Sequence, residues 1–168
     1  APRCCAQPGT TKDQEYRIIA RMLQPGGRVL DLGTGTGDLL SLLAREGGAT
    51  GTGVDIDLEN IIEVIDKGHD AFQGDIDLGL ATVPDGAYDY AVLNQTLQVV
   101  KRPRFVVQEM LRVAREGVVS FPNFGTWSNR LYLDWHGRMP KSRTLPFEWY
   151  DTPNIHLFTL NDFLTMCR

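Results

Sequence analysis

A run of spaced glycines directly after an apolar segment constrains this chain more than any other feature. Residues 29–32 predict a buried strand, Gly33, Gly35 and Gly37 follow, and a helical pattern begins near Asp38. Glycine adopts the positive φ angles that a tight strand-to-helix turn needs, and it lets a ligand approach bare backbone. In open parallel sheets such a turn lies at the carboxyl ends of the strands, where ligands bind. We therefore expect a nucleotide-like ligand here, although the turn could also be only a tight connection.

Short apolar runs alternate with helical segments over most of the chain. A first helix is predicted where Tyr16, Ile19, Ala20 and Leu23 follow helical spacing, and it ends at Pro25. The other predicted elements are strands at 29–32, 50–54, 71–72, 88–93 and 118–121, and helices at 39–45, 58–67, 104–113 and 160–166. This alternation predicts an α/β, Rossmann-like fold with three α/β/α layers around a mostly parallel sheet.

Length and composition predict one domain. The 168 residues, of which 42% are hydrophobic, suffice for one core and are too few to make two ordinary domains. We expect a flexible arm at 1–11 and a single domain at 12–168. Within it, residues 123–157 are rich in aromatics and prolines, which predicts a cap or interaction segment rather than sheet.

Charge and cysteine usage exclude several classes of partner. A net charge of -4 and a pI near 5.3 argue against binding nucleic acid or anionic membranes. The basic residues that accompany the aromatics of the second half fit a solvated rim or a protein interface better than an RNA site. The three cysteines lie at the two ends without metal-ligand spacing, so we expect no metal site. Without a signal peptide or a membrane-crossing run, the chain is expected to be cytoplasmic.

The spacing of the glycines bears on the ligand. In the dinucleotide fingerprint G-x-G-x-x-G, the third glycine counted from Gly33 would fall at position 38, which is Asp38. A carboxylate at a helix N-terminus repels a pyrophosphate, whereas a ligand that carries an ammonium and a sulfonium meets no such penalty. This favours S-adenosylmethionine (AdoMet), or its product S-adenosylhomocysteine (AdoHcy), over NAD or ATP. We expect Asp31 and Thr34 to contact it together with the glycines.

Other polar residues follow the later strands. Asp55 ends the second strand, where an acid binds ribose hydroxyls, and Asp75 follows the third, where it would accept from the adenine amino group. Both acids could instead have purely structural roles. Asp55 could be a helix N-cap, although Asp57 is better placed for that role, and Asp75 could stabilise a turn. The predicted cofactor contacts after the second, third and fourth strands are Asp55, Ile56, Asp75, Ile76, Asn94 and Gln95.

The sequence shows a cofactor site more clearly than a reaction. Methyl transfer needs an aligned acceptor and sometimes a base, and His136 and His156 are the candidate bases in the cap segment. A lone histidine is more often structural than catalytic, so the catalytic residues stay unknown. The chain also lacks the paired prolines that follow an Asn or Asp in methyltransferases acting on amino groups of DNA, RNA or protein glutamine.

Several segments together resemble the bacterial methionine biosynthesis protein MetW family. They are residues 29–37, 73–75 (Gln-Gly-Asp), 94–98 (Asn-Gln-Thr-Leu-Gln), 119–125 (Val-Ser-Phe-Pro-Asn-Phe-Gly) and 149–157 (Trp-Tyr-Asp-Thr-Pro-Asn-Ile-His-Leu). The resemblance runs from about Arg28 to Arg168. It implies a class I methyltransferase-like sheet with strand order 3-2-1-4-5, whose last strands are missing or lie outside this chain.

The resemblance also implies a role in methionine synthesis, where MetW-like proteins act with a homoserine O-acyltransferase and support its activity. Two hypotheses follow: an AdoMet-binding regulatory partner of that enzyme, or a methyltransferase acting on a small molecule. Trp149, Tyr150 and His156 are the candidate contacts for the substrate or partner. The oligomeric state and the methyl acceptor are left open.

Overall fold

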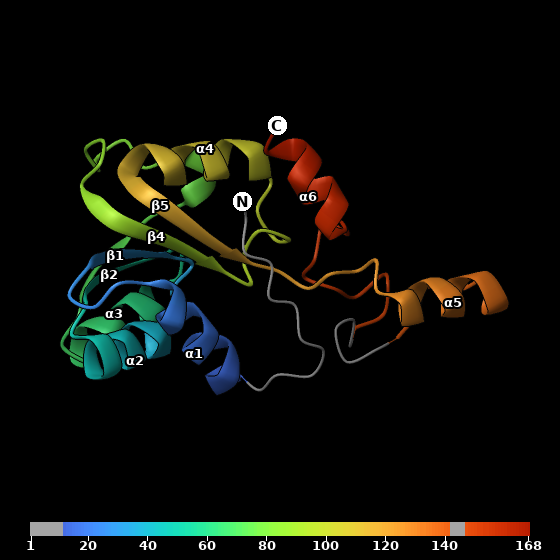
Figure 1. Ribbon diagram of the computed structural model, residues 1–168, viewed down its shortest axis with the longest axis horizontal. Helices are drawn as coiled ribbons and strands as arrows, with labels where there is room; N and C mark the ends of the chain where they lie inside the picture. The colour runs from blue at the N-terminus through green and yellow to red at the C-terminus, as the bar shows by residue number, and fades with distance from the viewer. Residues whose placement is uncertain (1–11, 142–146) are drawn as a thin grey trace.

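A five-stranded parallel sheet in the order β3-β2-β1-β4-β5 forms the centre of the molecule (Figure 1). The computed structural model describes residues 12–141 and 147–168, so the predicted arm at 1–11 lies outside the described residues. The strands are β1 (Arg28–Leu32), β2 (Thr50–Asp55), β3 (Asp70–Gln73), β4 (Tyr88–Asn94) and β5 (Ala114–Ser120). The predicted order and parallel direction are confirmed, since Asp31 of β1 pairs with Gly53 on one side and Val92 on the other.

Helices cover both faces of the sheet. The helices next to the sheet are distributed over its two faces (Figure 1). They are α1 (Lys12–Met22), α2 (Asp38–Gly47) and α3 (Leu58–Asp66) on the first face, and η1 (Ile76–Leu78) and α4 (Pro103–Val113) on the second. Side chains alternate along β1, so Val29 joins the core under α1 and α2 while Leu30 and Leu32 join the core under α4.

The fifth strand is longer than the sequence indicated. It begins at Ala114, directly after α4, whereas the apolar pattern predicted a start at Val118. The pairing extends from Tyr88 opposite Ala114 to Asn94 opposite Ser120. The early part was missed because Arg115 and Glu116 are exposed and charged, which an edge strand tolerates.

The cap segment contains a helix that the sequence analysis did not predict. Helix α5 (Trp127–His136) projects away from the sheet and ends at Gly137, whose φ is 61° (Figure 1). Its one buried residue, Asn129, donates from Nδ2 to the carbonyl of Phe124 at 3.2 Å. Trp127, Leu131 and Trp135 follow helical spacing, but the side of the helix that they form is exposed instead of packed on a core.

The chain then returns to the body and ends in α6 (Leu160–Met166). Phe158 and Phe163 pack on Phe121, with ring centroids 4.7 and 5.0 Å from it. This aromatic cluster fixes the base of the segment that carries α5. No helix among the described residues is long and apolar enough to cross a membrane.

Candidate cofactor site

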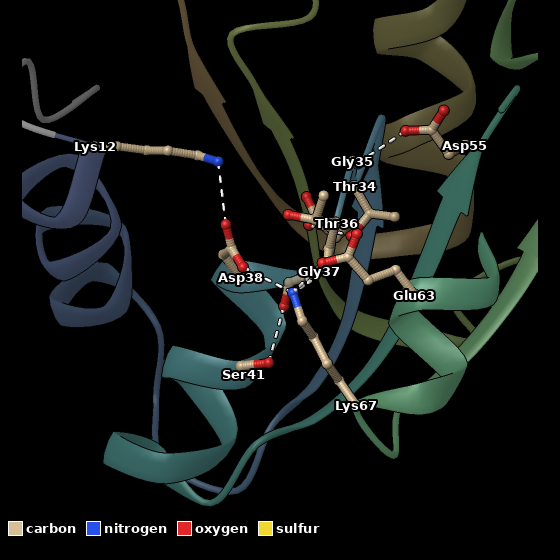
Figure 2. Close-up of polar contacts among 11 residues, drawn as sticks. Lys12, Thr34, Gly35, Thr36, Gly37, Asp38, Ser41, Asp55, Glu63 and Lys67 are labelled. Atoms are coloured by element: carbon tan, nitrogen blue, oxygen red, sulfur yellow. Dashed lines mark hydrogen bonds and ion pairs between the residues drawn. The ribbon is translucent and has the colours of Figure 1, made fainter. Parts of the chain in front are cut away.

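The glycine turn after β1 is tied to the neighbouring strand β2. The amides of Gly33 and Thr34 both donate to the carbonyl of Val54, at 2.8 and 3.0 Å. The amide of Gly35 donates to Oδ2 of Asp55 at 2.8 Å (Figure 2). Gly37 then caps α2 with a φ of 76°. The predicted turn is therefore a real structural unit, held by backbone and by one carboxylate.

Two of the glycines differ in what lies beside them. A Cβ on Gly33 would lie 2.7 Å from Oγ1 of Thr96, so this glycine makes room for the loop after β4. A Cβ on Gly35 would meet nothing within 4 Å. Both residues have positive φ, 74° and 54°, which disfavours other residues. The open side of Gly35 faces space that a ligand could fill.

That space is a hollow of about 290 Å³ at the carboxyl ends of β1 and β4. Six of its lining residues were predicted as cofactor contacts: Asp31, Gly33, Thr34, Gly35, Asn94 and Gln95. Four were not predicted: Lys12, Glu15, Tyr16 and Leu39. A second hollow of about 210 Å³ lies at the other end of α1, around Arg21, Pro25 and Gly47. The first has the position that parallel sheets use for ligands.

Asp31 is the most unusual side chain in the hollow. It is 2% exposed, and Oδ2 accepts a 2.8 Å hydrogen bond from the hydroxyl of Thr34. Oδ1 is buried and has no hydrogen-bond partner among the described residues. Burial raises the pKa of Asp31 to about 7, although the Thr34 bond opposes the shift. A buried acceptor without a partner fits a ligand donor such as an ammonium.

Asp38, which the sequence analysis treated as an uncompensated carboxylate, is paired with two lysines. Lys67 donates to Oδ1 at 2.9 Å and Lys12 to Oδ2 at 3.2 Å (Figure 2). Lys67 first, and then Lys12 and Thr36, lower the pKa of Asp38 to about 2. Because the lysines offset the negative charge, Asp38 repels a phosphate less than predicted. The case against a dinucleotide therefore rests on the missing third glycine.

Asp55 stands beside the turn rather than in the lining of the hollow. Its Oδ2 accepts from Gly35 and its Oδ1 accepts from the amide of Asp57 at 2.9 Å. A carboxylate offers about four acceptor positions, so two are left for ribose hydroxyls. The N-cap of α3 is Asp57, whose side chain accepts from Glu59. The next residue, Ile56, is 66% exposed, at the surface beside Asp55.

The predicted adenine contacts lie after β3. Asp75 is the N-cap of η1, and its Oδ1 accepts from the amide of Asp77 at 2.9 Å. Ile76 is buried in the core under α4. The hydrogen bond of Asp75 to Asp77 is the turn contact considered as the alternative. Neither Asp75 nor Ile76 lines the hollow, and their contact with adenine stays a prediction.

The loop after β4 closes the hollow from the opposite side. Gln95 has a φ of 52°, the only positive value of a non-glycine residue in the described chain. Its amide donates to the carbonyl and hydroxyl oxygens of Ser120, at 3.0 and 3.1 Å, and Ser120 in turn donates to the side chain of Asn94. Backbone held in a sparsely populated conformation is often found at binding sites.

The candidate substrate or partner residues lie outside the hollow. Trp149 and Tyr150 are 72% and 71% exposed and pack edge-to-face, with ring centroids 5.6 Å apart. His156 lies closer to the site, because its amide donates to the carbonyl of Gln98 at 3.0 Å. Nε2 of His156 is buried without a partner among the described residues. His136, the other candidate base, is exposed on α5 and stacks on Tyr132.

The missed lining residues come mostly from α1. The apolar spacing that predicted this helix also includes Tyr16, which is buried against the core, and burial raises its pKa. Lys12 and Glu15 lie four residues and one residue before Tyr16, and both line the hollow with it. Nothing in the local sequence shows that α1 crosses the end of β1, because that contact depends on the tertiary packing of α1 on α2.

No group of three or more metal-ligating side chains occurs in residues 12–141 and 147–168. The hollow instead offers bare backbone, a buried acid, a lysine and two amides. The buried acid and the lysine suit an ammonium and a carboxylate, which the amino-acid end of AdoMet or AdoHcy carries.

The parallel sheet, the glycine turn and the acid that ends β2 define the class I AdoMet-dependent methyltransferase-like fold. An AdoMet-dependent methyltransferase from Thermotoga maritima has this fold, with a TM-score of 0.65 and 20% identity over 90% of this chain and 66% of that one. YcgJ from Bacillus subtilis matches with a TM-score of 0.67 and 17% identity over 92% of this chain and 66% of that one.

The chain belongs to the methionine biosynthesis protein MetW family, whose model matches residues 13–168. It is 37% identical over 161 residues to the bifunctional methionine biosynthesis protein MetXA/MetW of Rhodopirellula baltica, covering 90% of this chain and 26% of that protein. A ubiquinone/menaquinone biosynthesis C-methyltransferase from Burkholderia mallei is 31% identical over 108 residues, 61% of this chain and 44% of that enzyme. The chain thus spans about a quarter of the first relative and under half of the second.

Proposed function

We propose that this protein binds AdoMet or AdoHcy in the hollow beside the glycine turn and supports a homoserine O-acyltransferase of methionine biosynthesis. The observation that carries the ligand is the pairing of two features in one place. The open side of Gly35 leaves room for a ligand, and the buried Oδ1 of Asp31 has no partner among the described residues. A ligand ammonium would satisfy that oxygen, which is costly to leave unpaired.

The other predicted residues would contact the remaining parts of the ligand. Asp55 would accept from the ribose hydroxyls, and Asp75 with Ile56 and Ile76 would border the adenine. Asn94 and Gln95 would contact the amino-acid end. AdoMet itself would supply a methyl group on a sulfonium, but binding alone is sufficient for a regulatory role.

The partner is inferred from the family and from the fused relative. The Rhodopirellula baltica protein is named for two parts, MetXA and MetW, in one chain, and fusion keeps two modules within reach of each other. We take the MetXA part to be the acyltransferase that the family resemblance implies. In this proposal residues 12–168 form one ligand-binding domain, and 123–157 contains the partner surface.

The surface that suits a partner is the part of the cap segment formed by α5 and residues 147–157. Trp127 and Trp135 are 75% and 79% exposed on α5. Exposed tryptophans and tyrosines are enriched where proteins bind each other. This surface, here called the aromatic arm, also contains the predicted contacts Trp149 and Tyr150.

A short chain of hydrogen bonds joins the hollow to the aromatic arm. The buried side chain of Gln98 donates from Nε2 to the carbonyl of Gln95, at 2.8 Å. The carbonyl of Gln98 accepts from the amides of Ile155 and His156, at 2.9 and 3.0 Å. A ligand that moves Gln95 therefore has a physical route to the base of the arm, which favours a ligand-sensing role.

Two measurements on one preparation test this function. Calorimetric titration should show binding of AdoMet or AdoHcy to the wild type, with weaker binding to Asp55→Ala because the ribose contact and the Gly35 bond are both lost. Co-expression should show the acyltransferase co-purifying with this protein and changing in activity. The proposal would be contradicted if the wild type bound neither AdoMet nor AdoHcy. It would also be contradicted if the acyltransferase neither co-purified with this protein nor changed in activity.

A methyltransferase acting on a small molecule is the second candidate, and one observation favours it. Nε2 of His156 and Oε1 of Gln98 are both buried without partners among the described residues, and backbone hydrogen bonding joins these two residues. Such groups could orient an acceptor or remove its proton. Incubation with methyl-labelled AdoMet and cell extract should then label a small molecule, and His156→Ala should abolish the label. An unlabelled extract despite confirmed AdoMet binding would count against this activity.

A further inference from the structure

We propose that Ser120, the last residue of β5, is a positioning residue of the candidate cofactor site. Its hydroxyl fixes the side chain of Asn94 and supports the backbone of Gln95, both of which line the hollow. This inference rests on the proposed AdoMet or AdoHcy site and adds to it a residue that is not among those lining the hollow. Ser120 lies directly opposite Asn94, at the last pair of the register between β4 and β5.

The hydroxyl of Ser120 makes two hydrogen bonds of opposite direction. It accepts from the amide of Gln95 at 3.1 Å, and it donates to Oδ1 of Asn94. A hydroxyl can do both at once, because it has one hydrogen to donate and two lone pairs to accept with. An alanine or a valine at this position could do neither. The two contacts to the loop after β4 therefore depend on one oxygen atom of the neighbouring strand.

The bond from Ser120 decides which end of the Asn94 amide is offered to a ligand. An amide side chain has an acceptor oxygen and a donor nitrogen, and the two ends exchange places when the group rotates by half a turn. Because the hydroxyl of Ser120 donates to Oδ1, Nδ2 is the end left for a ligand in the hollow that Asn94 lines. Asn94 therefore acts there as a hydrogen-bond donor, and it suits an acceptor atom of the ligand.

The backbone of Gln95 supplies a second, independent observation, because its φ of 52° is uncommon for a residue other than glycine. Ser120 binds the amide of Gln95 through its carbonyl at 3.0 Å as well as through its hydroxyl. From the other side, Nε2 of Gln98 donates to the carbonyl of Gln95 at 2.8 Å. A sparsely populated conformation persists where the surroundings hold it from several directions. Without the hydroxyl, the carbonyl contact would keep the loop folded, but the side chain of Asn94 would lose its fixed orientation.

The variants Ser120→Val and Ser120→Thr isolate the hydroxyl, because valine and threonine are nearly the same shape and both favour strands. In calorimetric titration with AdoHcy, Ser120→Val should raise the dissociation constant about fivefold, as expected for the loss of one neutral hydrogen bond. Ser120→Thr should recover most of that loss. Ser128→Ala is the control, because it removes an exposed hydroxyl on α5, and it should bind AdoHcy like the wild type.

A double-mutant cycle shows whether Ser120 acts through Asn94. In an Asn94→Ala background, Ser120→Val should raise the dissociation constant by no more than about twofold, because the amide that the hydroxyl orients is already gone. An equal loss of affinity in both backgrounds would reduce the effect to general packing and overturn the proposal. Equal affinities of Ser120→Thr and Ser120→Val would overturn it as well. A wild type that does not bind AdoHcy would instead contradict the cofactor site itself.

Discussion

The two aspartates that flank the glycine turn have opposite acid-base properties. Burial raises the pKa of Asp31, whereas Lys67 and Lys12 lower that of Asp38. The sequence indicated both acids but not their different pKa shifts, because burial and ion pairing depend on elements distant in the chain. It located the acid at the end of β2 correctly, yet it could not show that Asp55 holds Gly35. The contribution of α1 to the hollow was missed entirely for the same reason.

Asp31→Asn should stabilise the protein at neutral pH and weaken its ligand binding. A carboxyl whose folded pKa is raised to about 7 from 3.8 stabilises the fold at low pH, and this contribution is lost as the pH rises through about 7. The advantage of Asp31→Asn in unfolding free energy should therefore grow from pH 4 to pH 7.5, reaching at most about 4 kcal/mol. Chemical denaturation at several pH values measures it.

The same variant tests the ligand contact. Wild-type affinity for AdoHcy should rise with pH as Asp31 ionises, and that rise should be absent in Asp31→Asn. Equal pH profiles for the two proteins would contradict a contact between Asp31 and the ligand ammonium. Thr34→Val is a useful control, since it removes the hydrogen bond to Asp31 without removing the carboxyl.

At the scale of elements, periodicity predicted the sheet and its flanking helices but not α5. The central strands β1 and β4 were found because they are buried and form apolar runs in the sequence. Helix α5 is exposed at every position except Asn129, so its aromatic residues pack on no core. A helix that packs on no core is hard to predict from its sequence. The exposed aromatic residues of α5 favour contact with another molecule.

Replacing both Trp127 and Trp135 by alanine should remove acyltransferase association while leaving the fold intact. Exposed side chains contribute little to stability, so the thermal midpoint should change by no more than about 2 °C. Tryptophan anchors at interfaces contribute about 2 kcal/mol or more each, so the dissociation constant of the double variant should rise by about several hundredfold. Surface plasmon resonance against the acyltransferase measures this change.

An exposed apolar residue away from α5 provides the comparison. Ile62 on α3 is 52% exposed, and Ile62→Ala should leave acyltransferase binding unchanged. Retained binding in the double tryptophan variant, with Ile62→Ala behaving like wild type, would show that the partner uses another face.

At the scale of the whole molecule, hydrogen bonds through Gln98 join the candidate cofactor site to the aromatic arm. If ligand occupancy alters partner affinity, the partner must alter ligand affinity by the same factor. The acyltransferase should therefore change the affinity for AdoHcy by a certain factor. AdoHcy should change the affinity for the acyltransferase by the same factor and in the same direction. Paired calorimetric titrations measure both factors.

Gln98→Ala should reduce that factor to near one. The substitution removes the side-chain bond to Gln95 but keeps the carbonyl that Ile155 and His156 use. Each binding event should persist on its own, while communication between the two is lost. Gln108→Ala, on the exposed side of α4, is the control and should preserve the coupling. An unchanged factor in Gln98→Ala would exclude this route.

The contrast between Asp31 and Asp38 has a practical consequence for handling the protein. Asp38 stays ionised in mild acid, so the ion pairs that secure the start of α2 survive at pH 5, where Asp31 is protonated. A column wash at that pH should strip endogenous ligand from a protein that is still folded. Material prepared in this way, and returned to pH 8, would provide a ligand-free starting point for every titration above.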